Sequence, residues 1–259
     1  MNSLFSLKNK VAIVTGAGRG IGKALALGLA QAGADVVVAA RTVADIEGTA
    51  AQIRALGKRS IPVPTDVLVS EHVDIMVRRT LEEFNRVDIL VNNMGTFQKR
   101  LPTSKLREDV WDRFTQENLR PFFLCSKAVL EAMTEQGKGS IINISSLAGL
   151  RPCPGQLAYS AAKAGVINLT QGLAVEWAPY HVRVNCIAPG WMVAAYSENQ
   201  FFQEIANRVP LKRAGRGEDV VGTAIYLASD ASDYVTGVTI PVDGGLSSLQ
   251  LSFLTRDLI

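Results

Sequence analysis

Short runs of apolar residues alternate with longer helical patterns along this chain of 259 residues. Within the short runs apolar residues follow one another without polar alternation, which is typical of strands buried on both faces. Within longer segments such as 43–57 and 70–84, apolar residues recur three and four positions apart, which is typical of amphipathic helices. The pattern predicts strands at 11–15, 34–40, 60–64, 88–93, 140–145, 182–187 and 238–242.

Strands that alternate with helices and are covered on both faces predict an α/β fold, a Rossmann-type doubly wound parallel sheet of about seven strands with helices on both faces. The segment 60–64 (SIPVP) carries Pro62 and Pro64, which lack the amide hydrogen that a sheet ladder needs, so this strand is expected at an edge. In the doubly wound order 3-2-1-4-5-6 the third strand is an edge strand, so the two arguments agree. Because no repeat or linker interrupts the pattern, we expect residues 1–259 to form a single domain.

Charge, cysteine content and hydropathy narrow the class of protein. The formal net charge is +3 and no basic cluster recurs along one face, which argues against nucleic acid as a partner. Cys125, Cys153 and Cys186 are odd in number and widely spaced, so we expect buried, reduced thiols in a cytoplasmic protein and no metal site. The first residues lack the apolar core of a signal peptide, and no run of 18 apolar residues predicts a membrane span.

The first chemical motif is TGAGRGIG at 15–22, between the first predicted strand and an alanine-rich helix. Glycines there allow a tight turn and let the backbone approach a pyrophosphate at the helix N-terminus, where amide hydrogens are unpaired. An ordinary strand-to-helix turn is the alternative. Because this loop follows the first strand and opens a βαβ unit, we interpret it as a dinucleotide-binding loop.

The second motif is LAYSAAKAG at 157–165, which places Tyr159 and Lys163 four residues apart. In a helix the two side chains lie on one face and can reach a common ligand. The alternative is a surface helix with a solvated lysine and a half-buried tyrosine. A neighbouring ammonium stabilises a phenolate, so Lys163 is expected to draw the pKa of Tyr159 down toward the working pH.

Together these motifs resemble the short-chain dehydrogenase/reductase family over nearly the whole chain. NNMG at 92–95 stands where the family has NNAG, Asp66 in TDV matches a residue near the adenine, and PG at 189–190 closes the nicotinamide side. The family's catalytic four match Asn118, Ser146, Tyr159 and Lys163, and Ser146 precedes Tyr159 by the usual 13 residues.

The resemblance implies that Tyr159 exchanges a proton with a carbonyl or alcohol oxygen while a hydride passes between nicotinamide and carbon. Ser146 would hydrogen-bond the same oxygen, Lys163 would also hold the nicotinamide ribose, and Asn118 would position a water that relays protons from Lys163. Two alternatives stand beside this interpretation: Ser146 could merely cap the next turn, and Asn118 could satisfy backbone left unpaired by Pro121.

The nicotinamide is expected to be NADP(H) rather than NAD(H). NAD enzymes usually place an acid at the end of the second strand, but here Ala40 stands at that place and Arg41 follows. A guanidinium suits a 2′-phosphate, and Arg19 could supply a second charge, unless it only caps a solvated loop. The expected cofactor-binding residues are Gly16, Arg19, Gly20, Ile21, Gly22, Arg41, Asp66, Val67, Asn92, Gly95, Tyr159, Lys163, Pro189, Gly190 and Met192.

The chain departs from the family pattern at two positions. Met94 replaces the alanine of NNAG, for which we expect local repacking, and Ala194 replaces a threonine that often contacts the nicotinamide amide. Residues 191–210 would form a substrate lid. Its aromatic residues could equally line the core or a subunit contact, and they are Trp191, Tyr196, Phe201 and Phe202.

The favoured function is an NADP(H)-dependent oxidoreductase acting on a ketone or secondary alcohol of a small molecule. The start and end of the chain resemble both 3-oxoacyl-carrier-protein reductases and sugar-acid (gluconate-type) dehydrogenases. A carrier protein would need a basic docking surface, for which the candidates are Lys99, Arg100, Lys105 and Arg107. A non-enzymatic NADP-sensing protein is the alternative of a different class.

The last 15 residues, 245–259 (GLSSLQLSFLTRDLI), carry an apolar load too heavy for a solvated end. Relatives are commonly tetramers with two-fold symmetry. The tail therefore predicts a homotetramer in which this segment packs on neighbouring subunits. The alternative is a tail that folds back on its own core.

Overall fold

A single sheet of seven parallel strands organises the part of the chain that the computed structural model describes, namely residues 3–97, 99–193, 204 and 206–249. The strand order is β3-β2-β1-β4-β5-β6-β7. The strands are β1 (Val11–Thr15), β2 (Asp35–Ala40), β3 (Ser60–Pro64), β4 (Ile89–Asn92), β5 (Gly139–Ile144), β6 (Val182–Pro189) and β7 (Thr239–Val242). All seven predicted strands are present, and the doubly wound order is confirmed.

The prolines place β3 at the edge as predicted. Pro62 pairs with Val38 and Pro64 with Ala40 of β2, and β3 has no other neighbour among the described strands. β6 runs two residues further than predicted, to Pro189, because Ala188 and Pro189 still pair with β7.

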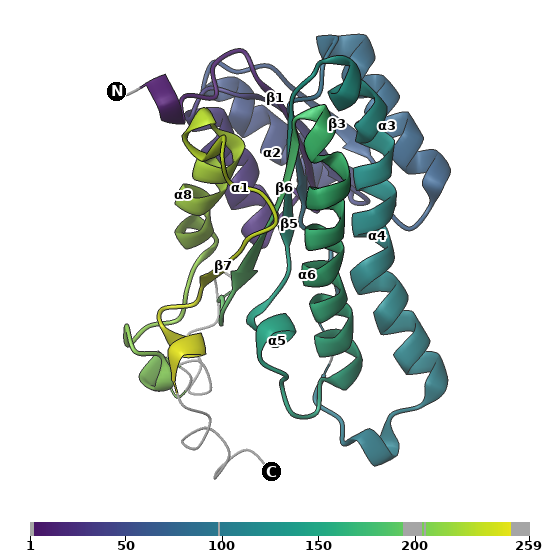
Figure 1. Cartoon of the computed structure of the whole chain (residues 1–259), viewed down its shortest axis with the longest axis vertical. Coiled ribbons are helices and arrows are strands. Elements are labelled where there is room, and N and C mark those ends of the chain that lie inside the picture. The colour runs from purple at the N-terminus through teal and green to yellow at the C-terminus, as the bar shows by residue number, and fades with distance from the viewer. Residues whose placement is uncertain (1–2, 98, 194–203, 205, 250–259) are drawn as a thin grey trace.

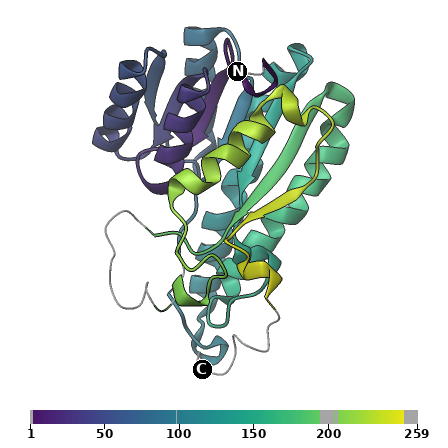
Figure 2. The same cartoon turned by 90° about the vertical axis from the view of Figure 1, so that its left-hand side faces the viewer.

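Helices cover both faces of the sheet (Figure 1). They are α1 (Gly20–Gln31), α2 (Val43–Ala55), α3 (Ser70–Phe84), α4 (Glu108–Glu135), α5 (Leu147–Leu150), α6 (Leu157–Trp177) and α8 (Gly217–Ala228). One hydrophobic core joins the sheet to α1, α2 and α8, and a second core joins it to α3, α4 and α6. Figure 2 shows α1 and α8 side by side across the first face.

The strands feed both cores because successive side chains of a strand point to opposite faces. In β1, Ala12 and Val14 pack in the first core, whereas Val11 and Ile13 pack in the second. All four are buried, which explains why the sequence reads as an unbroken apolar run.

The carboxyl ends of the strands and the start of α6 lie at the lower end of Figure 1, beside α5. β1 and β4 are neighbours there, although β2 and β3 separate them in sequence. The strand order therefore reverses between β1 and β4, and ligands of open α/β sheets bind in the crevice at such a switch point. The loops after β1 and β4 are those that carry the glycine motif and NNMG.

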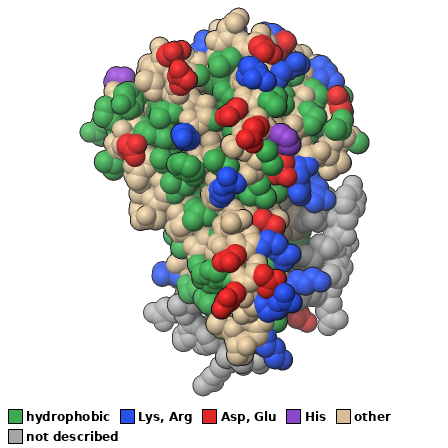
Figure 3. Space-filling view, turned by 90° about the vertical axis from the view of Figure 1, so that its right-hand side faces the viewer, with side chains coloured by type: hydrophobic (Ala, Val, Ile, Leu, Met, Phe, Trp, Pro, Cys, Tyr) green, Lys and Arg blue, Asp and Glu red, His purple; other side chains and the backbone are tan. Residues whose placement is uncertain are grey.

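The outer surface on the side of α3 and α4 mixes both signs of charge, with hydrophobic side chains between them (Figure 3). None of the described helices combines the length and the apolar character needed to cross a bilayer. The three cysteines are free thiols; Cys125 and Cys186 are buried as expected, but Cys153 is half-buried, because it lies in the loop before α6 rather than in the core.

The expected lid and tail fall largely outside the described residues. Of the lid, the structure describes residues 191–193, 204 and 206–210, and Met192 forms a parallel bridge with Gly215. Its aromatic residues Tyr196, Phe201 and Phe202 lie outside, as do Ala194 and the tail from residue 250. Within the described start of the tail, Leu246 is buried in a short 3-10 helix (Leu246–Ser248). That the tail packs on a neighbouring subunit stays a prediction.

Candidate active site

The glycine loop brings the start of α1 close to the end of β1. Gly16 and Gly20 have φ values of +64° and +56°, a left-handed conformation that favours glycine. A Cβ atom on Gly22 would lie 2.2 Å from the carbonyl oxygen of Gly16, so the helix backbone packs directly on the loop. Only glycine at position 22 allows this approach.

The first turn of α1 is open to an anion. Arg19 is the N-cap residue, and among the described residues no side chain accepts a hydrogen bond from the amides of this turn. Uncapped amides at a helix N-terminus point outward and, with the helix dipole, favour a phosphate group. Arg19 itself is exposed, and its own side chain makes no capping hydrogen bond. Gly20, Ile21 and Gly22 form this turn, as the sequence predicted.

Asn93, which the sequence analysis missed, supports the loop from β4. Its side-chain amide donates to the carbonyls of Thr15 and Gly16 at 3.3 and 3.4 Å, and its backbone amide donates to the Thr15 hydroxyl at 3.0 Å. Asn92, the predicted cofactor contact, faces the other way. Its Nδ2 donates to Ser126 and Asn143 inside the protein, so its side chain does not reach the crevice.

The end of the crevice at which the sequence predicts the adenosine is formed by the ends of β2 and β3. Arg41 follows β2, is exposed, and makes no hydrogen bond or ion pair with the described residues. The glycine loop packs on the first turn of α2, since a Cβ on Gly18 would lie 2.7 Å from Cβ of Asp45. The segments that carry Arg19 and Arg41 are therefore adjacent, which suits two cations around one phosphate.

Asp66 and Val67 follow β3 on the same edge of the sheet. One carboxylate oxygen of Asp66 accepts a hydrogen bond from the amide of Leu68 at 3.1 Å, which orients the side chain. Val67 is buried. Met94 is half-buried and packs against the second core.

The residues expected to bound the nicotinamide lie beyond β6. A Cβ on Gly190 would lie 2.7 Å from Cα of Asp243, so the chain after Pro189 passes directly against the turn after β7. The amide of Gly190 donates to the carbonyl of Val242 at 3.0 Å. Met192 is held by its bridge to Gly215 and packs against the first core.

Tyr159 and Lys163 lie one turn apart near the start of α6, on one face as predicted. Nζ of Lys163 lies 5.9 Å from the ring centroid of Tyr159 and 4.7 Å from that of Phe122. It donates a hydrogen bond of 3.1 Å to the carbonyl of Ile144, and the residue is only 3% exposed. The ammonium is therefore a buried group beside the phenol, which excludes the solvated lysine of the alternative interpretation.

The pKa of both groups moves in the direction that burial dictates. Burial raises the pKa of Tyr159 above its ordinary value, although its hydrogen bond with Ser146 lowers it. Burial lowers the pKa of Lys163 to about 8. The expectation that Lys163 brings the pKa of Tyr159 down is thus wrong in net direction, because loss of hydration outweighs the stabilisation of the phenolate. At neutral pH Tyr159 is a protonated phenol, able to donate a proton.

Ser146 has both functions that the sequence left open. Its hydroxyl accepts a hydrogen bond of 3.1 Å from the amide of Ala148 and so caps α5, and its side chain is also hydrogen-bonded to Tyr159. The neighbouring Ser145 is directed elsewhere, to the carbonyl of Lys163. Ser146 is therefore the serine that reaches the reacting end of Tyr159.

Asn118 is fully buried in α4 and all its polar atoms are used. Its Oδ1 accepts from the amide of Thr96 at 3.0 Å, and its Nδ2 donates to the carbonyl of Phe114 at 2.9 Å and to the Thr96 hydroxyl at 3.2 Å. Pro121 frees the carbonyl of residue 117, so Asn118 does not repair that gap.

Gly95 separates Asn118 from Lys163. A Cβ on Gly95 would lie 2.9 Å from Oδ1 of Asn118 and 3.1 Å from Nζ of Lys163. Both side chains therefore flank the same point of the NNMG segment. The structure brings Asn118, Ser146, Tyr159 and Lys163 to one end of the sheet, as the sequence predicted.

Two loops that lie side by side border Tyr159. The loop after β4 contacts the loop before α6 through a hydrogen bond of 2.8 Å from the amide of Leu101 to the carbonyl of Gly155. Phe97 in the first loop is 64% exposed, and its ring centroid lies 6.0 Å from that of Tyr159. Phe97 could not be found from the sequence, because an isolated aromatic residue in a loop carries no periodic signal.

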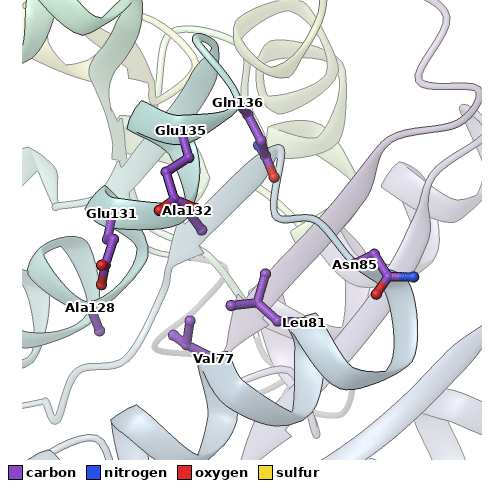
Figure 4. Close-up of a pocket in the computed structure, with 8 residues that line it drawn as sticks. All are labelled: Val77, Leu81, Asn85, Ala128, Glu131, Ala132, Glu135 and Gln136. Carbon is purple, nitrogen blue, oxygen red and sulfur yellow. The ribbon is translucent and has the colours of Figure 1, made fainter.

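A separate cavity of about 320 Å³ lies between α3 and α4 (Figure 4). Gln136, one of its lining residues, exchanges two hydrogen bonds with Val87 just before β4. This cavity is therefore at the amino ends of the strands, opposite the catalytic groups. Its lining residues are Val77, Leu81, Asn85, Ala128, Glu131, Ala132, Glu135 and Gln136.

Comparison with known proteins agrees with the geometry. A family model described as enoyl-(acyl carrier protein) reductase matches residues 16–247. The chain is 44% identical to a 3-oxoacyl-[acyl-carrier-protein] reductase of Synechocystis over 93% of this chain and 98% of that protein. It is 39% identical to the 2-dehydro-3-deoxy-D-gluconate 5-dehydrogenase of Escherichia coli over 94% and 97%. A gluconate 5-dehydrogenase from Burkholderia cenocepacia, solved with NADP and tartrate, superposes with a TM-score of 0.89 at 36% identity, covering 96% of this chain and 99% of that one.

Proposed function

Since this chain belongs to the short-chain dehydrogenase/reductase family and is an oxidoreductase acting on CH–OH and C=O groups, we propose that its cofactor is NADP(H) and that Tyr159 is its general acid/base. The observation that carries the assignment of Tyr159 is its position: it is hydrogen-bonded to Ser146 and lies beside the buried ammonium of Lys163.

The residues around the crevice fit a dinucleotide phosphate. Gly16 and Gly22 form a cradle that a Cβ atom would fill, and the first turn of α1 offers uncapped amides for the pyrophosphate. Arg41, exposed and unpaired among the described residues, would bind the 2′-phosphate, with Arg19 on the adjacent loop. The nicotinamide side would be bounded by Gly190 and Met192, with Lys163 on the ribose.

In the direction of reduction, bound NADPH would supply the hydride that the carbonyl carbon accepts. Tyr159, protonated at neutral pH, donates its phenolic proton to the carbonyl oxygen, and Ser146 donates a hydrogen bond to the same oxygen as negative charge develops on it. Lys163 returns a proton toward Tyr159, and Asn118 holds the Thr96–Gly95 segment that adjoins Lys163. One ketone, one hydride and one proton give one secondary alcohol.

For the substrate we propose a 3-oxoacyl thioester held by an acidic carrier, with a sugar acid as the second candidate. Residues 96–107 and 147–158, the two loops beside Tyr159, contain five Lys or Arg residues (Lys99, Arg100, Lys105, Arg107 and Arg151) and no Asp or Glu. Because the whole chain has a net charge of only +3, the rest of it is net negative, and positive charge concentrates at these loops. A basic rim favours an anionic substrate or partner.

The exposed ring of Phe97 beside Tyr159 favours an acyl chain over a polyhydroxylated sugar acid, because apolar surface gains most from apolar contact. The test measures reduction of an acetoacetyl thioester and of 5-ketogluconate by the purified protein. Each substrate is assayed once with NADPH and once with NADH. A kcat/KM higher for the thioester supports the first candidate, and the reverse order supports the second. No turnover with any ketone, together with tight NADPH binding, would favour a sensor protein.

We further propose a homotetramer located in the cytoplasm. Apolar side chains that are exposed in the single chain support association: Val175 on α6 is 80% exposed and Phe123 on α4 is 47% exposed. Light scattering measures the mass directly. Deletion of residues 249–259 should reduce it if the tail packs on neighbouring subunits, and an unaltered tetramer of unaltered stability would exclude that role.

A further inference from the structure

Three consecutive residues at the end of β5 hold one turn of α6. The carbonyl of Ile144 accepts the 3.1 Å hydrogen bond from Nζ of Lys163. The hydroxyl of Ser145 donates a 2.8 Å hydrogen bond to the backbone carbonyl of the same lysine. Ser146, the third residue, is hydrogen-bonded to Tyr159. Lys163 is thus held at its side-chain end and at its backbone end by neighbouring residues.

Ser145 is itself firmly placed in the sheet. Its amide donates a 2.8 Å hydrogen bond to the carbonyl of Ile187 on β6, and the residue is 5% exposed. Its hydroxyl therefore projects from a fixed strand end toward α6. A buried hydrogen bond between a strand end and a helix carbonyl opposes sliding or rotation of that helix turn, since its loss would leave a buried polar group unpaired.

Gly149 provides a second, independent observation on the same peptide. A Cβ atom on Gly149 would lie 2.7 Å from both the carbonyl carbon and the carbonyl oxygen of Lys163. The backbone of α5 therefore packs directly on the Lys163 peptide. Ser145 and Gly149, from a strand end and a short helix, enclose this one carbonyl.

We propose that Ser145 is a positioning residue, which fixes the turn of α6 so that Tyr159 and Lys163 meet the substrate oxygen in register with Ser146. The assignment rests on the proposed function, in which that turn carries the proton transfer, and it adds a residue that touches neither substrate nor cofactor. A group that fixes a catalytic pair matters because a displacement of about 1 Å at the reacting centre lowers rates by about 100-fold.

The test compares Ser145→Ala with a matched control in the same strand. Ser140, at the other end of β5, is 3% exposed, and its hydroxyl donates a 2.8 Å hydrogen bond to the carbonyl of Leu227, far from the catalytic turn. Both variants lose one buried hydroxyl of the same geometry, so the loss of thermal stability should be similar. Only Ser145→Ala should affect the catalytic turn.

Two readouts separate positioning from stability. The first is the titration of Lys163 in protein labelled with 13Cε-lysine, its resonance assigned as the one absent from Lys163→Met. In Ser145→Ala the midpoint should rise by about half a pH unit or more, because the loosened turn lets water reach the ammonium. The second is kcat, which should fall by about 10-fold or more while the NADPH dissociation constant stays within about threefold. Ser140→Ala should keep both wild-type values.

A wild-type titration and kcat in Ser145→Ala, with a stability loss equal to that of Ser140→Ala, would overturn the proposal. Should Ser145→Ala fail to fold, Ser145→Thr and Ser145→Cys decide: the threonine keeps the hydroxyl donor and should resemble wild type, whereas the weakly donating thiol should not. Equal behaviour of these two variants would also overturn it. The titration requires no turnover, so it decides on Ser145 even if the proposed reaction proves wrong.

Discussion

Lys163 and Tyr159 lose their protons in the reverse of the order that the free side chains follow. The ordinary pKa of lysine, 10.5, lies above that of tyrosine, 10.0. In the folded protein burial brings the pKa of Lys163 to about 8 and raises that of Tyr159. The lysine therefore becomes neutral while the neighbouring phenol, 5.9 Å away at its ring centroid, still holds its proton. This ordering suits a phenol that donates and a lysine that resupplies it.

Replacing Tyr159 by phenylalanine should remove the proton donor and little else. We expect kcat to fall by at least about 100-fold, the usual scale of general acid catalysis, with NADPH binding within about threefold of wild type. Stopped-flow measurement of NADPH oxidation and fluorescence titration of NADPH check the two values. Near-normal turnover would rule out Tyr159 as the general acid.

The rate of ketone reduction should depend on the charge of Lys163. Its ammonium predominates below a pKa of about 8, so kcat should be highest below that pH and decline above it. A pH profile from 6 to 10 tests this, with Lys163→Arg as the control, because a guanidinium stays charged over the whole range. If Lys163→Arg shows the same decline of kcat near pH 8, a group other than Lys163 causes that decline.

Lys163 should also cost stability at neutral pH. The pKa of Lys163 is lower in the folded protein than in the unfolded chain. Between pH about 8 and pH 10.5 the unfolded chain therefore binds more protons, and the stability of the fold rises with pH. Below pH about 8 the full cost of burying the charged ammonium applies. Lys163→Met should therefore increase the free energy of unfolding at pH 7, by at most about 3 kcal/mol, less the lost hydrogen bond to Ile144. Urea unfolding at pH 7 and pH 9.5 should show the gain shrinking with pH. A gain that grows with pH would contradict it.

Arg41→Asp should change the cofactor preference toward NAD(H). The substitution removes a partner of the 2′-phosphate and offers an acceptor to a ribose hydroxyl. The measurement is the ratio of kcat/KM for NADPH and NADH, with Lys127→Asp, an exposed cation on α4, as a charge-matched control. The ratio should fall by at least about 10-fold in the first variant only, since charge-assisted pairs contribute more than 1.4 kcal/mol. Equal ratios in both variants would show that Arg41 does not bind the phosphate.

Phe97→Ala should weaken binding of an apolar acyl substrate while sparing the cofactor. The ring is 64% exposed next to Tyr159, so a bound acyl chain would cover it. We expect KM for a medium-chain 3-oxoacyl thioester to rise by about 5-fold or more, and Phe97→Leu, which keeps apolar surface, to lie between. An unchanged KM for the acyl substrate would show that its acyl chain does not bind against Phe97.

The sequence predicted the elements whose signals are local. Two prolines identified β3 as the edge strand, and the resemblance to a known family identified Ser146, Tyr159 and Lys163, which the fold brings together. The sequence could not predict properties that depend on which way a side chain points or on how deeply it is buried. Asn92 and Asn93 differ by one strand position and therefore face opposite sides, and only the structure shows which one supports the glycine loop. The pKa of Tyr159 likewise depends on how much water the fold removes, which no spacing reveals.

The uncapped first turn of α1 makes local order depend on what binds there. Because no side chain among the described residues accepts a hydrogen bond from its leading amides, this turn should exchange its amide hydrogens with solvent faster than the interior of the same helix. An anion that accepts those hydrogen bonds would slow the exchange and, because it binds only the folded chain, would raise the melting temperature with its concentration. In this enzyme, cofactor supply would therefore also set how long the folded protein survives.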